Sequence, residues 1–190
     1  MADLFVVNEQ FDQVDYKKKA LPTGEYELCR FIGCDFTKSD LSGSVFYDCE
    51  FIDCQLSGVK LMKTALRDIR FRNCKAEGLH FEQCNDFLFA VSFDSCLLNR
   101  SSFYKQKIKN TSFRKSSLHE VDFTGADLTG SDFDECDLRR AMFENTILEK
   151  ADFRTAYNYS LDPEVNRLSK AKFSLAGVAG LLVKYGIDIE

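Results

Sequence analysis

Eight cysteines and two histidines are the residues of this 190-residue chain whose chemistry could build a disulfide framework or a metal site. Their spacing favours neither arrangement. C-x-x-C pairs are absent, and the intervals between cysteines are multiples of five except for one that is two residues longer. We therefore predict small buried thiols at regular positions of a repeat, namely Cys29, Cys34, Cys49, Cys54, Cys74, Cys84, Cys96 and Cys136.

A disulfide is still geometrically open to the cysteines that share one phase of the repeat. Cys34, Cys54, Cys74 and Cys96 would stack at steps of about 4.8 Å, which is close enough for a bond. No secretory signal is present, so we expect reduced thiols in the cytoplasm. No apolar stretch approaches the roughly twenty residues of a membrane span, so we expect no membrane partner.

Neither the histidines nor the paired acids form a catalytic constellation. His80 and His119 fall at different phases of the repeat, and no metal-ligand spacing surrounds either of them. Phosphate-binding, nucleophile-elbow and dinucleotide-binding glycine motifs are absent from the sequence. Asp132 and Asp134 form an acidic pair without a positioned partner. The sequence therefore predicts a protein that is not an enzyme and that has no metal or cofactor.

The elements that position these residues repeat every five residues, and phenylalanine recurs every twenty. A period of five suits neither a helix nor an ordinary strand, but a short bridge followed by a corner has this length. Four such units close a square coil, and equivalent side chains stack in ladders along the rod. The most regular ladder consists of Phe11, Phe31, Phe51, Phe71, Phe93, Phe113, Phe133 and Phe153.

Two registers of central inward residues describe the repeat. The first runs from Phe11 to Phe81, and the second runs from Leu88 to Phe153 with Phe, Leu or Ile at every fifth position. An irregular stretch from Glu82 to Phe87 joins them and contains a slip of two residues. We expect an all-β solenoid over residues 1–157, with the slip near residues 82–88, and a separate ending over residues 158–190.

Charge is distributed unevenly along the predicted rod. Residues 1–53, 54–119, 120–153 and 154–190 carry net charges of −6, +7, −7 and +1, which total the −5 of the chain. The third zone could be a binding surface for a basic partner, or its carboxylates could simply solvate the rod. Direct nucleic-acid binding through the basic middle is not expected, because the chain is acidic and lacks a recognised motif.

The last residues depart from the repeat. Asp162 before Pro163 predicts a helical turn, and Ser174 is a suitable cap for a helix from about Leu175 to Tyr185 that ends at Gly186. Ile187 to Ile189 reads as a short strand. The end of a solenoid needs a cover, so we expect a helical cap, a dimer interface or both, formed by Val178, Leu181, Leu182, Ile187 and Ile189.

The units Ala126-Asp127-Leu128-Thr129-Gly130 and Ala151-Asp152-Phe153 resemble the A-(D/N)-(L/F)-x-x unit of pentapeptide repeat proteins. This resemblance implies a right-handed quadrilateral β-helix. The ending Asn158 to Pro163, followed by Lys170 to Leu175 and Leu181-Leu182, is similar to that of the Qnr-like quinolone-resistance and albicidin-immunity group. Members of that group are cytosolic dimers joined at their C-terminal ends, which bind DNA gyrase or topoisomerase IV by imitating duplex DNA.

The resemblance implies a non-enzymatic, homodimeric protein that binds a type II topoisomerase and modulates it or protects it from antibiotics such as quinolones. The expected contact is an acidic face formed by Asp122, Asp127, Asp132, Asp134 and Asp137. Two features depart from the group: long projecting loops are absent, and the middle of the rod is basic. The alternative hypothesis is a structural protein–protein interaction module for an unrelated partner, and a weaker third uses the basic middle to bind nucleic acid.

Overall fold

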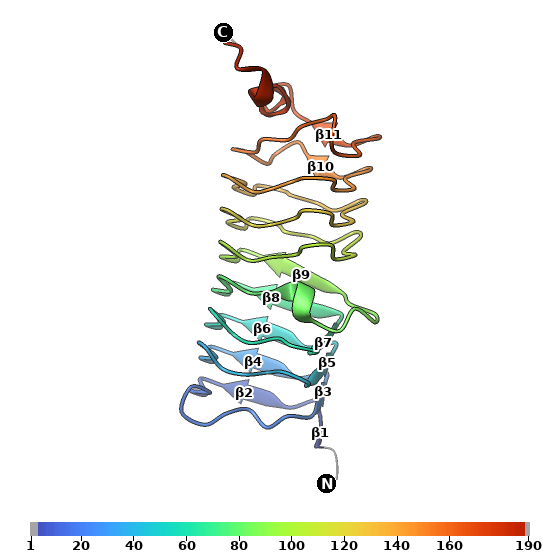
Figure 1. The fold of residues 1–190 in the computed structure, drawn as a ribbon. Coiled ribbons are helices and arrows are strands. Elements are labelled where there is room, and N and C mark those ends of the chain that lie inside the picture. Colours follow the sequence, from blue (N-terminus) through green and yellow to red (C-terminus); the bar gives the residue numbers. More distant parts are fainter. Residues whose placement is uncertain (1–3, 189–190) are drawn as a thin grey trace.

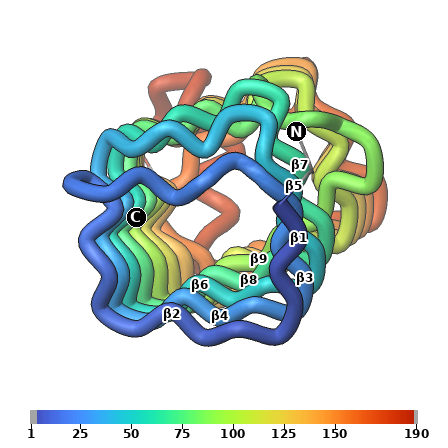
Figure 2. Tube along the Cα trace, turned by 90° about the horizontal axis from the view of Figure 1, so that it is seen from below, coloured from blue at the N-terminus to red at the C-terminus, as the bar shows by residue number. Residues whose placement is uncertain are grey.

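The computed structural model describes residues 4–188 and is a right-handed, four-sided β-helix with a small cap of 3₁₀ turns at its C-terminal end (Figure 1). The coils stack around a common axis when the rod is viewed from its N-terminal end (Figure 2). This arrangement confirms the all-β solenoid expected from the five-residue repeat. No helix among the described residues is long and apolar enough to cross a membrane.

Regular parallel strands form in the first half of the rod, where two successive sides of each coil are extended. One sheet contains β1 (Phe5–Val7), β3 (Glu25–Glu27), β5 (Val45–Tyr47) and β7 (Ala65–Arg67). The other contains β2 (Gln10–Asp12), β4 (Arg30–Ile32), β6 (Glu50–Ile52), β8 (Ile69–Arg72) and β9 (Val91–Asp94). Residues twenty apart pair with one another, as Phe11 does with Phe31.

Beyond β9 the coils are held by single parallel bridges, until β10 (Asp152–Phe153) pairs with β11 (Lys172–Phe173). Strand β11 lies within the segment 158–190 that we assigned to the ending, so coil stacking continues into that segment. We name the four sides of the rod after their first strand or first central residue. In chain order they are the β1 side, the β2 side, the Tyr16 side and the Leu21 side.

Stacked aromatic rings fill the centre of the rod. The predicted phenylalanine ladder is continuous across the slip, and Phe173 adds one more ring to it. Neighbouring rings in this ladder are 4.5–5.4 Å apart between centroids. A second ladder on the Leu21 side, which includes Phe103 and Phe123, meets the first edge-on. Edge-to-face and offset contacts suit the quadrupole of the rings, so the interior is filled by the chain itself.

The second inward position of each unit, two residues before the centre, explains the cysteines. Their side chains are buried, and all eight thiols are free. The Sγ atom of Cys54 donates a hydrogen bond to the carbonyl oxygen of Phe31 in the preceding coil at 3.3 Å, and Cys74 does the same to Phe51. The hydroxyl groups of Thr64 and Thr146 make the equivalent bond. Cysteine, serine and threonine thus have the same structural role at this position: each donates a hydrogen bond to a backbone carbonyl oxygen of the preceding coil.

The slip is absorbed by a projecting bulge. After the short 3₁₀ helix η1 (Phe81–Gln83), the chain leaves the coil at Asp86 and returns at Phe89, which is buried against Phe81. The prediction that Leu88 is a central inward residue is wrong, because its side chain is 64% exposed. The two additional residues are lifted out of the coil, so Phe89 fills the core in place of Leu88.

The C-terminal cap is less helical than predicted. Two 3₁₀ turns, η2 (Val178–Leu181) and η3 (Val183–Tyr185), replace the helix expected from Leu175 to Tyr185. A side chain at Gly180 would lie 2.5 Å from the carbonyl oxygen of Tyr159, so close packing requires glycine, which is a poor helix former.

The local signals around the cap are confirmed. Ser174 Oγ accepts the N–H of Gly177, Gly186 ends η3 with φ of 58°, and Asp162 Oδ1 accepts the N–H of Glu164. The expected strand at residues 187–189 does not form over Ile187 and Asp188. Ile189 lies outside the described residues.

Candidate protein-binding surface

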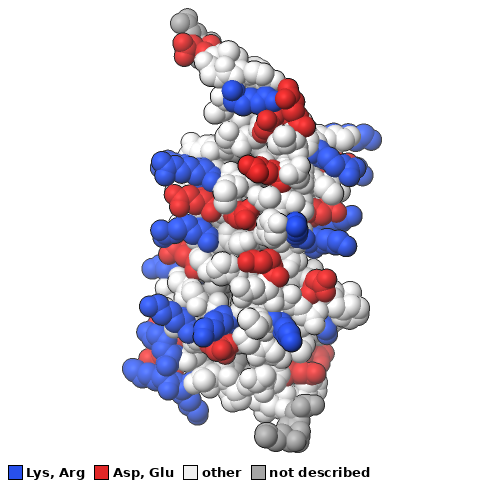
Figure 3. Space-filling view, in the orientation of Figure 1, with Lys and Arg blue, Asp and Glu red and all other residues white. Residues whose placement is uncertain are grey.

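The five aspartates predicted to form one acidic face lie on all four sides of the rod. Bridges place Asp122 on the Leu21 side, Asp127 on the β1 side, Asp137 on the Tyr16 side and Asp132 on the β2 side, where Asp134 follows it. An interval of five residues advances the chain by one side, so equivalent positions of successive units point in different directions. The prediction of a single acidic face is therefore wrong. On the side that Figure 3 presents, acidic and basic side chains alternate along the rod.

Each aspartate that precedes a central residue also stabilises the corner that follows it. In Asp122, Asp127, Asp132 and Asp137 the Oδ1 atom accepts the backbone N–H two residues further on, at 2.8–3.2 Å. Such turns within one unit are a common use of aspartate. Part of the acidic character of residues 120–153 is therefore required by the coil itself.

Two of the five carboxylates contact basic side chains of neighbouring coils. Lys109 Nζ lies 3.2 Å from Asp127 Oδ2, and His119 Nε2 lies 2.8 Å from Asp137 Oδ2. Burial raises the pKa of Asp127, but hydrogen bonds from Thr129 and the ion pair with Lys109 outweigh it, so the pKa falls below its ordinary value. Hydrogen bonds from Asn158 and His119 likewise outweigh burial and lower the pKa of Asp137.

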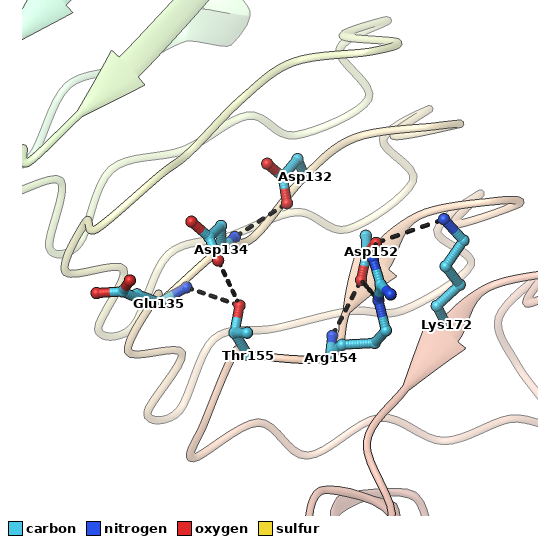
Figure 4. A network of polar contacts seen from close by, with 7 residues as sticks. All are labelled: Asp132, Asp134, Glu135, Asp152, Arg154, Thr155 and Lys172. Carbon is cyan, nitrogen blue, oxygen red and sulfur yellow. Dashed lines mark hydrogen bonds and ion pairs between the residues drawn. The ribbon is translucent and has the colours of Figure 1, made fainter.

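The β2 side holds a different arrangement, which we call the acidic layer: Asp132, Asp134 and Glu135 from a single coil (Figure 4). Within the described part of the chain, no lysine, arginine or histidine lies at ion-pair distance from these three carboxylates. Partial burial and then repulsion from Asp134 raise the pKa of Asp132. The carboxylates of Asp132 and Asp134 are therefore held close together against their repulsion.

The next coil fixes the acidic layer without neutralising it. Thr155 Oγ1 donates to Asp134 Oδ1 at 2.7 Å and accepts the N–H of Glu135 at 3.0 Å (Figure 4). Asp152, one coil above Asp132, is instead held by a two-pronged contact with Arg154. That contact lowers the pKa of Asp152 to about 2.

An open hollow of about 570 Å³ lies over this part of the β2 side. Carboxylates from the acidic layer line one part of it, and Lys150, Arg154 and Lys172 line another. No group of histidine, cysteine, aspartate and glutamate within residues 4–188 could hold a metal ion. Within that range each histidine contacts one carboxylate: His80 lies against Glu82, and His119 lies against Asp137. The arrangement can bind cationic side chains, and nothing in it activates a nucleophile.

Some of the predicted cap residues pack against the end of the rod, and others are exposed to solvent. Leu181 packs against the core and Leu182 is half-buried, whereas Val178 and Ile187 are exposed. Further exposed apolar side chains on the same segment are Leu175, Val183 and Tyr185. The segment therefore closes the end of the rod and also presents an apolar surface to solvent.

The predicted five-residue face omitted three members of the network on the β2 side: Glu135 and Asp152, which lie within the acidic zone 120–153, and Thr155. The interval of twenty residues between Asp132 and Asp152 was the available signal, because it places both residues on one side in adjacent coils. Asp134 and Thr155 are close for the same reason.

Comparison with known proteins is consistent with this geometry. A family model described as "pentapeptide repeat region" matches residues 25–86 and 79–153. The solved structure of the trypsin-treated R167E form of QnrB1, a plasmid-mediated fluoroquinolone resistance protein, superposes with a TM-score of 0.66. It is 20% identical, and the match covers 99% of this chain and 98% of that one.

Full-length QnrB1 superposes with a TM-score of 0.56 at 18% identity, over 97% of this chain and all of the other. No curated protein is significantly similar in sequence.

Proposed function

Because the chain belongs to the pentapeptide repeat family, we propose that it is a non-enzymatic cytoplasmic protein that binds a type II topoisomerase. DNA gyrase or topoisomerase IV would be the partner, and binding would modulate the enzyme or protect it from quinolones. The likeness of fold to QnrB1, a plasmid-mediated fluoroquinolone resistance protein, supports this choice of partner.

The dimensions of the rod support the proposal. Eight steps separate Phe11 from Phe173 in the phenylalanine ladder. At about 4.8 Å per step the ladder spans about 38 Å, which is comparable with a turn of B-DNA at about 34 Å. A rod filled by its own rings offers no internal site, so its function must reside on its surface.

The observation that carries the proposal is the acidic layer. Asp132, Asp134 and Glu135 are carboxylates without an ion pair on a rigid frame, and partial burial followed by repulsion from Asp134 raises the pKa of Asp132. Lysine or arginine side chains of a DNA-binding surface would relieve that repulsion. Such a surface is already arranged to receive phosphates, and complementary charge accelerates encounter as well as fixing orientation.

A dimer through the C-terminal segment completes the proposal. The exposed apolar side chains of Val178, Val183, Tyr185 and Ile187 would be covered by the same segment of a second copy. That arrangement would double the length of the rod and bring both acidic layers towards its centre.

The test is a supercoiling assay in which the purified protein is titrated into DNA gyrase, with and without a quinolone. We expect inhibition by the protein alone or recovery of activity in the presence of the drug. The variant Asp132→Asn/Asp134→Asn/Glu135→Gln should lose either effect. No effect at a large molar excess of the natural sequence would contradict the proposal and favour an interaction module for another partner.

A further inference from the structure

We propose that the bulge at Asp86–Leu88, together with the lysines around it, is a second binding surface that takes an acidic peptide segment carrying large apolar side chains. This surface lies at the corner between the Leu21 side and the β1 side, where the chain projects from the rod in Figure 1. It shares no residue with the acidic layer, which lies on the β2 side and nearer to the C-terminal end.

The bulge presents apolar side chains on a defined backbone. Phe87 and Leu88 are 63% and 64% exposed, although both are large and apolar. The backbone is fixed at each end, because Asn85 Oδ1 accepts the N–H of Phe87 at 2.9 Å and Asp86 O accepts that of Phe89. An ordered loop loses little conformational entropy on binding, which favours affinity.

A hollow of about 630 Å³ adjoins the bulge. Phe87 and Leu88 form one wall, and Tyr104, Lys105 and Lys107 form another. The lining therefore combines exposed apolar side chains with two lysines, and it also includes Glu82 and Asp86. A side chain of the size of leucine or phenylalanine could enter it while neighbouring carboxylates meet the lysines.

The cations around the bulge form no ion pairs within the described part of the chain, as is also true of Lys38, Lys60 and Arg100 elsewhere on the rod. Among the described residues, no carboxylate lies at ion-pair distance from Lys63, Arg67, Lys105 or Lys107. Lys63 lies one coil below η1, since its N–H bonds to the carbonyl oxygen of Gln83. Lysines without partners in a coil structure that otherwise pairs many of its charges are available to an acidic ligand.

A peptide fits this surface better than a nucleic acid. The guanidinium of Arg67 covers the ring of Phe87 at 5.4 Å from its centroid, and Lys105 Nζ lies 4.8 Å from the centroid of Tyr104. The ring faces on which bases would stack are thus partly occupied. Glu82 and Asp86 also line the hollow, so the carboxylates of a bound peptide would have to lie on the side of Lys105 and Lys107.

The apolar character continues along the β1 side below the bulge, where Tyr47, Leu28 and Val7 are also exposed. Tyr47 and Arg67 are paired residues of β5 and β7, and Arg67 contacts Phe87. In register, Val7, Glu27, Tyr47 and Arg67 form one row on this side, so Tyr47 lies next to Arg67 and Glu27 separates it from Val7.

Fluorescence anisotropy with the full chain tests the proposal. The probe is a labelled peptide of aspartate and glutamate around a central Phe-Leu pair, and we expect saturable binding at low salt. Phe87→Ser/Leu88→Ser and, separately, Lys105→Glu/Lys107→Glu should each weaken binding at least about tenfold. The matched control Lys38→Glu/Arg100→Glu changes the same charge on the Tyr16 side and should leave affinity within about twofold. Thermal unfolding of each variant verifies the fold.

Three results would overturn the proposal: no saturable binding, equal loss in the control variant, or tighter binding of a labelled oligothymidine than of the peptide. Replacing Phe-Leu by two serines in the probe should also weaken binding, and an unchanged affinity would show that only charge is recognised. Neutralising the acidic layer should leave peptide binding intact, so failure here is distinguishable from failure of the topoisomerase proposal.

Discussion

Two layers on the β2 side of the rod share the phenylalanine ladder and have opposite electrostatics. In the N-terminal half, Glu50 on β6 lies 3.4, 3.3 and 3.0 Å from Arg30, Arg70 and Arg72 of the adjoining coils. In the C-terminal half, Asp132 occupies the position equivalent to Glu50, and within residues 4–188 no cation lies at ion-pair distance from it or from Asp134 and Glu135 of the acidic layer. The first layer is satisfied by its own neighbours, whereas the carboxylates of the second carry the proposed binding role.

The stacked phenylalanine ladder, which is the frame of the rod, is common to both layers, whereas their charges come from outward side chains. Phe51 and Phe133 lie in one ladder, with nearly equal spacing to the rings on either side. Since the frame is the same, the difference in charge arises only from the outward residues. Binding can therefore be altered on such a rod without altering its fold, because fold and function reside in different side chains.

Removing one ring of the phenylalanine ladder should have the largest effect on stability. Phe113 lies in the ladder between the two layers and is fully buried, so Phe113→Ala should lower the free energy of unfolding by about 3–5 kcal/mol. Urea unfolding followed by circular dichroism measures this change. Phe87→Ala, in the exposed bulge, is the matched control and should change stability by less than about 0.5 kcal/mol. Similar effects of the two changes would show that the stacked rings do not hold the rod together.

The inward hydrogen bond should come next. Cys54→Ala removes the donor to the Phe31 carbonyl oxygen, and we expect a loss of about 1–2 kcal/mol. Cys54→Ser retains a donor, as Thr64 and Thr146 do, and should lose less. The two unfolding curves decide the point, since a serine variant no more stable than the alanine variant would refute the hydrogen-bonding role of the thiol.

The two charged layers should respond in opposite directions to neutralisation. Glu50→Gln leaves three arginines without their carboxylate and should cost about 1 kcal/mol, because this pairing is a network of charges and not an isolated surface pair. Asp132→Asn removes repulsion while its side-chain oxygen can still accept the N–H of Asp134, so stability should stay equal or rise slightly. Chemical unfolding at neutral pH measures both, and a loss at Asp132→Asn as large as at Glu50→Gln would contradict the distinction.

The smallest effect should be the dependence of stability on pH. The pKa of Asp152 is lowered to about 2 from its ordinary 3.8, so its pair with Arg154 adds stability above about pH 4 that is lost as pH falls towards 2. The pKa of Asp132 is raised, so its ionisation destabilises the fold as pH rises above the ordinary value.

Unfolding measured from pH 2 to 6 should therefore show a shallower acid loss in Asp152→Asn and a steeper net gain with pH in Asp132→Asn. Identical pH profiles for the two variants would refute this assignment of the charges.

The repeat allowed most of the interior to be predicted, because every position of a ladder has the same buried environment. Phe and Leu mark the central inward positions, and Cys and Ser mark the second inward positions. Continuity from Phe71 to Phe93 followed from the spacing alone, but the choice of Phe89 over Leu88 for the core depended on how the bulge rejoins the coil. The C-terminal helix was mispredicted because local capping signals do not reveal the contact of Gly180 with Tyr159.

The surface was harder to predict than the core. Asp122, Asp127, Asp132 and Asp137 are contiguous in the pattern of the sequence, yet each points away from a different side. Pairing with Lys109 or His119 depends on the coil twenty residues away, which a linear charge count does not include. The acidic layer becomes visible only when outward residues are grouped by side and by coil.

The central claim is that the acidic layer binds a type II topoisomerase, and equilibrium binding to immobilised DNA gyrase tests it most directly. The neutralised variant Asp132→Asn/Asp134→Asn/Glu135→Gln is compared with Glu120→Gln/Asp122→Asn/Glu144→Gln, which loses the same charge from the other sides of the same zone. We predict at least about tenfold weaker binding by the first variant and a change within about twofold for the second. Equal affinities of the two variants, or no binding of the natural sequence, would contradict the account.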